Sequence, residues 1–192
     1  MADKHDFLPD KPGKGLLSRL HLTRQQRKTL LKWVLYSLLL LALSVLQDVV
    51  FSQMRIGGGT TDLVPCGIFL ICLAEGVDSG CVFALIASAL YLFSGTAPGP
   101  YAMVFITFLG ILATAFRQGY LQQGFSATML CTSLALVLYE LAVFAIGLFL
   151  QLTTGARIGA FVLTALFSIL VAPLLYWLVR RIGKIGGQEW KE

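Results

Sequence analysis

The chain has 192 residues, of which 57% are hydrophobic and only 13% are charged, and its mean hydropathy is +0.79. Soluble domains carry about 25% charged residues, so this composition excludes an ordinary soluble domain and indicates a multi-span membrane protein. The formal net charge of +5 comes from basic residues near the two ends of the chain. We interpret it as a membrane-topology signal, which argues against a nucleic-acid partner.

The first 28 residues are predicted to form a cytoplasmic basic tail. They hold seven of the 15 lysines and arginines and few apolar residues, a composition typical of flexible segments. Leucines among the basic residues leave open a short surface helix on anionic lipid. The apolar run that follows is too long for a secretory signal and lacks a small-residue cleavage pattern, so we expect an uncleaved anchor.

Residues 29–182 are predicted to form one all-α domain, a bundle of six transmembrane helices, with a short cytoplasmic tail at 183–192. A helix needs about 20 apolar residues to cross a bilayer core of ~30 Å. The second and third runs are shorter, so either the bilayer thins there, the helices extend through Glu75 and Asp78, or the pair inserts only partly. The predicted spans are about Leu30–Phe51, Leu63–Ala74, Cys81–Leu92, Tyr101–Phe116, Ala127–Leu150 and Ile158–Val179.

The distribution of lysine and arginine predicts that both termini are cytoplasmic. With six spans and the N-terminus inside, thirteen of the 15 basic residues lie on the inside, including Arg117 between the fourth and fifth spans. Only Arg55 and Arg157 lie outside. Cytoplasmic loops carry an excess of basic residues, so this asymmetry supports an even number of spans.

The connections between spans are rich in helix breakers. Phe93–Tyr101 contains two prolines and two glycines between two uncharged apolar runs, which predicts the tip of a transmembrane hairpin. Asp62 is expected to cap the second span, with Pro65 in its first turn. Glu75 and Asp78 are expected to lie in a solvated cytoplasmic turn.

Small residues recur at a spacing of four in two spans. Gly80, Ala84 and Ser88 mark one face of the third, and Ser168 and Ala172 mark one face of the sixth. Because small side chains let two helix backbones approach closely, we expect these faces to pack against neighbouring helices.

Glu140 lies near the middle of the fifth span, directly after Tyr139. A charged side chain at that depth costs about 2.5–3.5 kcal/mol on insertion scales. It is therefore expected to face the bundle interior, a cavity or a partner helix. A buried structural hydrogen bond is the alternative.

No catalytic, cofactor-binding or metal site is expected. The sequence has no membrane-embedded histidine, no paired glutamates and none of the H-E-x-x-H, G-x-S-x-G or phosphate-loop patterns. The cysteines lack C-x-x-C spacing and are expected to be small apolar residues in the helical core. They are Cys66, Cys72, Cys81 and Cys131.

Several short motifs, in order, resemble the bacterial rod shape-determining protein MreD family. The resemblance covers about Leu38–Arg181. The chain departs from the family pattern at Tyr91, where an Asp is frequent, and at Glu75–Gly80, which lacks basic residues. The matching motifs are Gln47 in the first span, Asp62-Leu63-Val64-Pro65, Leu92-Phe93-Ser94-Gly95 with Gly99 and Tyr101, Leu138-Tyr139-Glu140-Leu141, and Ala172-Pro173-Leu174-Leu175-Tyr176 followed by Arg180-Arg181.

The resemblance implies a non-enzymatic scaffold in the bacterial cytoplasmic membrane. Members of the family bind the single-span protein MreC and help connect cytoplasmic actin-like filaments to lateral cell-wall synthesis. The family fold is similar to that of the substrate-binding S subunits of energy-coupling-factor vitamin transporters, and such a transporter subunit is the alternative function.

The two hypotheses predict different sites. The scaffold predicts a lateral groove for a partner helix, shaped by Tyr139, Glu140 and the turn that holds Gly95, Gly99 and Tyr101. The transporter subunit predicts an enclosed polar pocket near the outer surface, covered by an outer loop.

Overall fold

The computed structural model describes residues 24–51, 61–121 and 124–185, and within these ranges it contains helices and connecting turns but no strands. Expectations about residues 1–23, Arg55 and the end of the C-terminal tail lie outside the described residues. Each of the six apolar runs forms a helix. The α-helices are α1 (Arg24–Leu46), α2 (Leu63–Glu75), α3 (Val77–Phe93), α4 (Pro100–Tyr120), α5 (Phe125–Phe149) and α6 (Ile158–Ile185).

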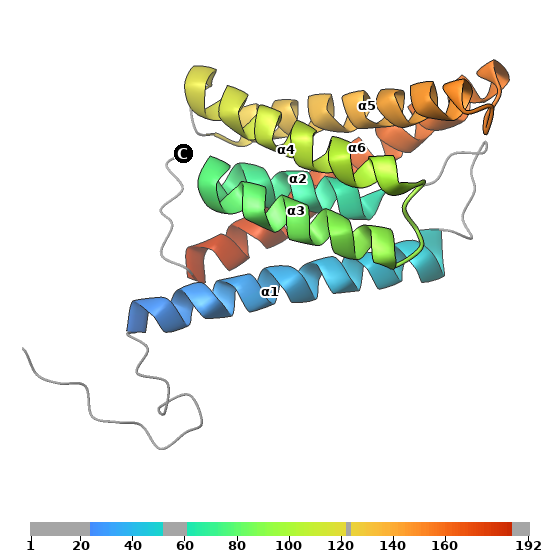
Figure 1. Ribbon diagram of the computed structural model, residues 1–192. Helices are drawn as coiled ribbons and strands as arrows, with labels where there is room; N and C mark the ends of the chain where they lie inside the picture. Colours follow the sequence, from blue (N-terminus) through green and yellow to red (C-terminus); the bar gives the residue numbers. More distant parts are fainter. Residues whose placement is uncertain (1–23, 52–60, 122–123, 186–192) are drawn as a thin grey trace, which may run out of the picture.

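Two short helical turns extend this set. The π-helical turn η2 (Gln47–Phe51) continues α1, and the 3-10 turn η3 (Gly155–Arg157) leads into α6. The start of α1 and the end of α6 lie at the same end of the bundle (Figure 1).

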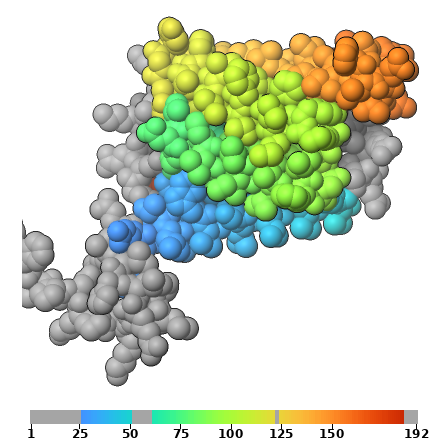
Figure 2. Space-filling model, viewed as in Figure 1, coloured from blue at the N-terminus to red at the C-terminus, as the bar shows by residue number. Residues whose placement is uncertain are grey.

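Helix α2 lies at the centre of the bundle and contacts each of the other five α-helices (Figure 1). Every residue from Leu63 to Leu73 is buried. Because this helix is apolar on all sides, it must be covered all round. In the space-filling view, side chains of α1, α3 and α4 make up much of the visible surface (Figure 2).

Four helical segments are long and apolar enough to cross a membrane, which is consistent with a multi-pass membrane protein. They are Gln26–Val50, Pro100–Tyr120, Phe125–Phe149 and Gly155–Ile185. The other two helices extend through Glu75 and Asp78, one of the options that the sequence left open. Even so, the 13 residues of α2 give a length of only ~20 Å, less than the ~30 Å hydrocarbon core.

The small-residue faces pack as expected. A Cβ added to Gly80 would lie 2.9 Å from the carbonyl oxygen of Cys72, so α2 and α3 touch through their backbones there. Ala84 and Ser88 continue this buried face, as Ser168 and Ala172 do on α6. The packing prediction from residue spacing is therefore confirmed.

The four cysteines are free thiols. Cys66, Cys72 and Cys131 are buried and Cys81 is half-buried. Their expected place in the helical core is confirmed for the three buried residues.

The prediction that Glu75 lies in a solvated turn is wrong. Its side chain is only 2% exposed and forms an ion pair with Lys32 of α1. The hydroxyl of Tyr36, also on α1, lies beside the same carboxylate. Asp78 is exposed, as expected. The error arises because Glu75 belongs to the last turn of α2, whose side chains face α1 rather than water.

Arg117 was expected in a polar connector, but α4 continues past it to Tyr120. The residue is 6% exposed. Its Nη1 donates hydrogen bonds to the carbonyl oxygen of Leu73, at 2.7 Å, and to the hydroxyl of Thr128, at 3.4 Å. Arg117 therefore caps the C-terminal end of α2, where carbonyl groups have no partner within the helix.

Replacement of Gly80 by alanine should destabilise the bundle by about 1–3 kcal/mol, because the added methyl group would push α2 and α3 apart. Gly119→Ala in α4 is the matched control, since nothing lies within 4 Å of the added carbon. That variant should keep or slightly raise stability, by up to ~1 kcal/mol. Thermal unfolding in detergent measures both, and equal midpoints for the two variants would contradict the close approach.

Replacement of Arg117 by methionine should lower the free energy of unfolding by about 1–3 kcal/mol, because the carbonyl of Leu73 would lose its buried donor. Lys184→Met in α6 removes an exposed positive charge and should change stability little. The measurement is the unfolding midpoint of each purified variant. A loss no larger than that of the Lys184 variant would show that Arg117 does not stabilise α2.

Candidate functional site

A small polar cavity lies at the end of the bundle where α3 turns into α4. Its volume is about 250 Å³. Residues from α3, α5, α6, the turn between α3 and α4, and the position directly before α2 surround it, so its shape depends on several helices. It is lined by Asp62, Tyr91, Thr96, Pro98, Glu140, Val143, Ala160, Phe161 and Thr164.

Glu140 and Asp62 bring two carboxyl groups into this cavity. Glu140 is 5% exposed, and its Oε1 atom has no hydrogen-bond partner. The carboxyl group of half-buried Asp62 lies within hydrogen-bonding reach of Glu140. Two carboxyl groups this close make a hydrogen bond only when they share a proton. The cavity is therefore rich in hydrogen-bond acceptors.

Asp62 stands directly before α2, but its side chain makes no capping hydrogen bond, so the expected cap is wrong. Gln47 of η2 replaces it, since its Oε1 accepts a hydrogen bond from the backbone N–H of Val64 at 3.0 Å. The Oγ of Ser168 accepts from the backbone N–H of Asp62 at 2.9 Å. Because these two side chains cap α2, the Asp62 carboxyl group is available to Glu140.

Gln47 also holds Tyr91 in place. Its Nε2 donates to the Tyr91 hydroxyl at 3.4 Å, and both side chains are buried. The proton of that hydroxyl remains available to an acceptor. Tyr91 forms one wall of the cavity.

The turn between α3 and α4 forms another wall of the cavity, through Thr96 and Pro98. Gly95 adopts a φ of +78°, in the left-handed region that favours glycine. A Cβ on Gly99 would lie 2.5 Å from the ring of Tyr101. The Tyr101 hydroxyl in turn donates to the Pro98 carbonyl at 3.0 Å, so this ring braces the turn. Gly95, Gly99 and Tyr101 thus shape the wall, although none of them lines the cavity.

Tyr139 lies in the core instead. Its side chain has no exposed surface, and its ring packs edge-on against Phe69 of α2 at 6.4 Å between centroids. A partner outside the bundle therefore has no access to this ring. The structure separates Tyr139 from Glu140 because adjacent helix residues point in different directions.

A lateral groove lies between α1 and α3, and Glu140 is not among the residues that line it. Its volume is about 870 Å³, and Val64 of α2 lies at its base. One wall runs from Trp33 on α1 to Asp48 on η2, and the other runs from Ser79 to Ser94. None of the residues that the sequence assigns to a partner groove lines it, neither Tyr139 and Glu140 nor Gly95, Gly99 and Tyr101.

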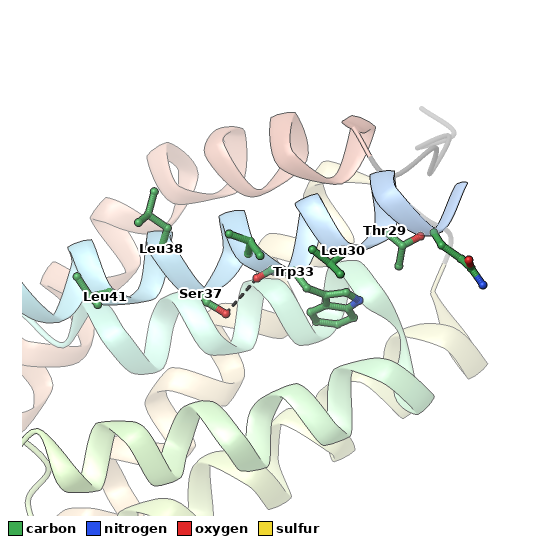
Figure 3. Close-up of a pocket in the computed structure, with 8 residues that line it drawn as sticks. Thr29, Leu30, Trp33, Ser37, Leu38 and Leu41 are labelled. Atoms are coloured by element: carbon green, nitrogen blue, oxygen red, sulfur yellow. Dashed lines mark hydrogen bonds between the residues drawn. The ribbon is translucent and has the colours of Figure 1, made fainter. Parts of the chain in front are cut away.

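The α1 wall of this groove is apolar with a few hydroxyl groups. Trp33 lies at one end of it, and its ring centroid is 5.4 Å from that of Phe83 on α3. Ser37 donates to the Trp33 carbonyl at 3.0 Å, so its hydroxyl is satisfied within α1 (Figure 3). Leu41 follows on the same helix and is largely exposed. This wall therefore offers an apolar surface to a neighbouring chain.

Tyr91 belongs to both sites, because it lines the lateral groove and the polar cavity. The groove and the cavity therefore adjoin at this side chain. The motif comparison singled out Gln47 and Tyr91, but nothing in the sequence indicated that they touch, because 44 positions separate them.

The cavity offers few ligands for a metal ion. Within residues 24–51, 61–121 and 124–185 no three His, Cys, Asp or Glu side chains gather as metal ligands. Ca²⁺ takes six to eight oxygen ligands and structural zinc takes four ligands, so two carboxyl groups would leave either ion underligated.

Neither a scan against protein-family models nor searches of curated proteins and of solved structures finds a match to this chain.

Replacement of Gln47 by leucine should destabilise the protein by about 1–3 kcal/mol, because it leaves the Val64 N–H and the Tyr91 hydroxyl without their partner. Gln118→Leu in α4 changes an exposed side chain and serves as the control. Unfolding in detergent measures both variants. Equal stability of the two would mean that Gln47 does not cap α2.

Proposed function

We propose that this protein is a non-enzymatic membrane scaffold of the rod or elongation complex. In this proposal it binds an MreC-like single-span protein and links cytoplasmic actin-like filaments to lateral peptidoglycan synthesis, and so regulates cell shape. The motifs shared with the MreD family suggest this role. The lateral groove between α1 and α3 is the observation that supports it most directly.

The groove has the form that a partner helix needs. On α1 and the first residues of η2 it extends over 16 residues from Trp33 to Asp48, or about 24 Å at 1.5 Å per residue, which is most of a bilayer core. Its surface is mainly apolar, and helices associate in membranes through close packing of such surfaces. A single transmembrane helix would cover the exposed side chains of Val82, Ile86 and Leu90 on α3.

The proposed topology has six spans, both termini in the cytoplasm and a fold resembling that of transporter S subunits. The described chain starts and finishes at one end of the bundle, as an even number of spans requires (Figure 1). Most of the basic residues lie at that same end, and cytoplasmic ends carry such an excess. In this topology the polar cavity opens toward the outer surface.

An S subunit of an energy-coupling-factor vitamin transporter is the second candidate. The polar cavity beside Asp62 and Glu140 favours it, because polar groups from several helices converge there. The volume argues against it. Small-molecule sites usually measure about 300–1,000 Å³, and this cavity, of about 250 Å³, falls below that range.

Replacement of Ile86 by tryptophan should prevent partner binding, because the larger ring would fill the groove that the partner helix needs. We expect recovery of the single-span partner from native membranes to fall at least ~10-fold, a loss of about 1.4 kcal/mol. Leu170→Trp is the matched control, since Leu170 is also exposed and lies on α6 outside the groove. Native co-purification followed by mass spectrometry is the measurement.

The same preparation separates the two functions. Recovery of a single-span partner with wall-synthesis proteins, together with cell rounding on depletion of the protein, supports the scaffold. Recovery of an ATPase pair and a multi-span coupling protein, with a small molecule retained, would replace it with the transporter subunit. Undiminished partner recovery with the Ile86 variant would exclude the groove as the binding site.

A further inference from the structure

The side chain of Glu140 lines the cavity, and its buried Oε1, a hydrogen-bond acceptor, has no partner. Buried polar atoms are nearly always hydrogen-bonded, and buried charges are paired, because burial without a partner costs several kcal/mol. A buried acceptor without a hydrogen-bond donor therefore indicates a place where another group binds. The half-buried Asp62 beside it adds a second carboxyl group.

The charge of the cavity indicates what kind of group fits. If the two carboxyl groups share one proton, the pair carries a single negative charge. Among the described residues that line the cavity none is basic. Arg157, in the turn before α6, is exposed. One positively charged group would therefore neutralise the pair.

The size of the cavity limits the cation further. Its volume of about 250 Å³ equals that of roughly eight water molecules at ~30 Å³ each. A lysine ammonium or an arginine guanidinium on its apolar stem matches such a cavity, because the stem can pack against Val143 and Phe161 while the head donates several hydrogen bonds.

The position of the cavity indicates where this group comes from. Tyr91 lines both the lateral groove and the cavity, and the chain that lines the groove up to Ser94 continues into Thr96 and Pro98 of the cavity wall. A helix that lies in the groove would therefore bring its next residues, those just outside the hydrocarbon core, close to the cavity.

We propose that the cavity beside Asp62 and Glu140 binds a lysine or arginine side chain of the single-span partner, at the outer end of that partner's membrane helix. This inference rests on the proposed scaffold function and names the chemistry that the site recognises. It predicts a partner with a basic residue on the side of the membrane where such residues are scarce.

The first part of the experiment maps the contact. Phe161 lines the cavity, so p-benzoylphenylalanine at that position, which adds a benzoyl group to the phenyl ring, places a photoreactive carbonyl at the cavity. The same substitution at Phe108, an exposed residue of α4, is the control. We expect irradiation of native membranes to link position 161, and not position 108, to the partner within two residues of a lysine or arginine.

The second part removes the charge. Glu140→Gln and Asp62→Asn keep the shape of each side chain, and each should reduce partner recovery at least tenfold. Replacement of the linked basic residue of the partner by glutamine should have the same effect. Asp78→Asn removes an exposed carboxylate from α3 and should leave recovery unchanged. Unfolding midpoints confirm that each variant is folded before its binding is compared. For any variant that is not folded, replacement of the linked basic residue of the partner by glutamine supplies the same test.

The outcomes distinguish this inference from the scaffold proposal. A cross-linked segment without a basic residue, or full partner recovery with Glu140→Gln and Asp62→Asn combined, would overturn the inference and leave the scaffold standing. If no single-span partner co-purifies with the wild-type protein, the scaffold proposal fails and the inference fails with it.

Discussion

The backbone ends of α2 impose the main constraint on this structure. In a short helix that is buried in a membrane protein, the terminal N–H and C=O groups cannot form hydrogen bonds with water. Each such group that lacks a partner costs several kcal/mol. Side chains from other helices supply the partners. Gln47 accepts from the N–H of Val64, and Arg117 donates to the carbonyl of Leu73. The short central helix thus fixes the positions of the longer helices around it.

This capping also builds the site. Because Gln47 binds Val64 and Tyr91 together, the end of α1, the start of α2 and the end of α3 keep one arrangement. The same arrangement frees Asp62 from a capping role and leaves its carboxyl group beside Glu140. A change at the helix cap would therefore reach both the groove and the cavity.

The helices could be predicted from the sequence, because apolar runs and helix breakers are local features. The roles of charged residues could not be predicted in the same way. Glu75 and Arg117 looked like loop residues, yet each is buried against a group at least 43 positions away. Such pairs depend on which helix faces which, and the sequence pattern does not contain that information. Glu140 was placed correctly in the interior because a mid-membrane carboxylate has few other options.

The contrast between the two ends of the bundle supports a binding role for Glu140. At one end Glu75 is paired with Lys32, so burial of its charge is compensated within the chain. At the other end Glu140 is also buried, but it lines a cavity in which no described residue is basic, and its Oε1 has no hydrogen-bond partner. Folding alone would favour an apolar residue or a paired charge at this position. Proteins retain such exceptions mainly where function requires them, which is why the cavity, and not the core around Tyr139, is the place to look for recognition.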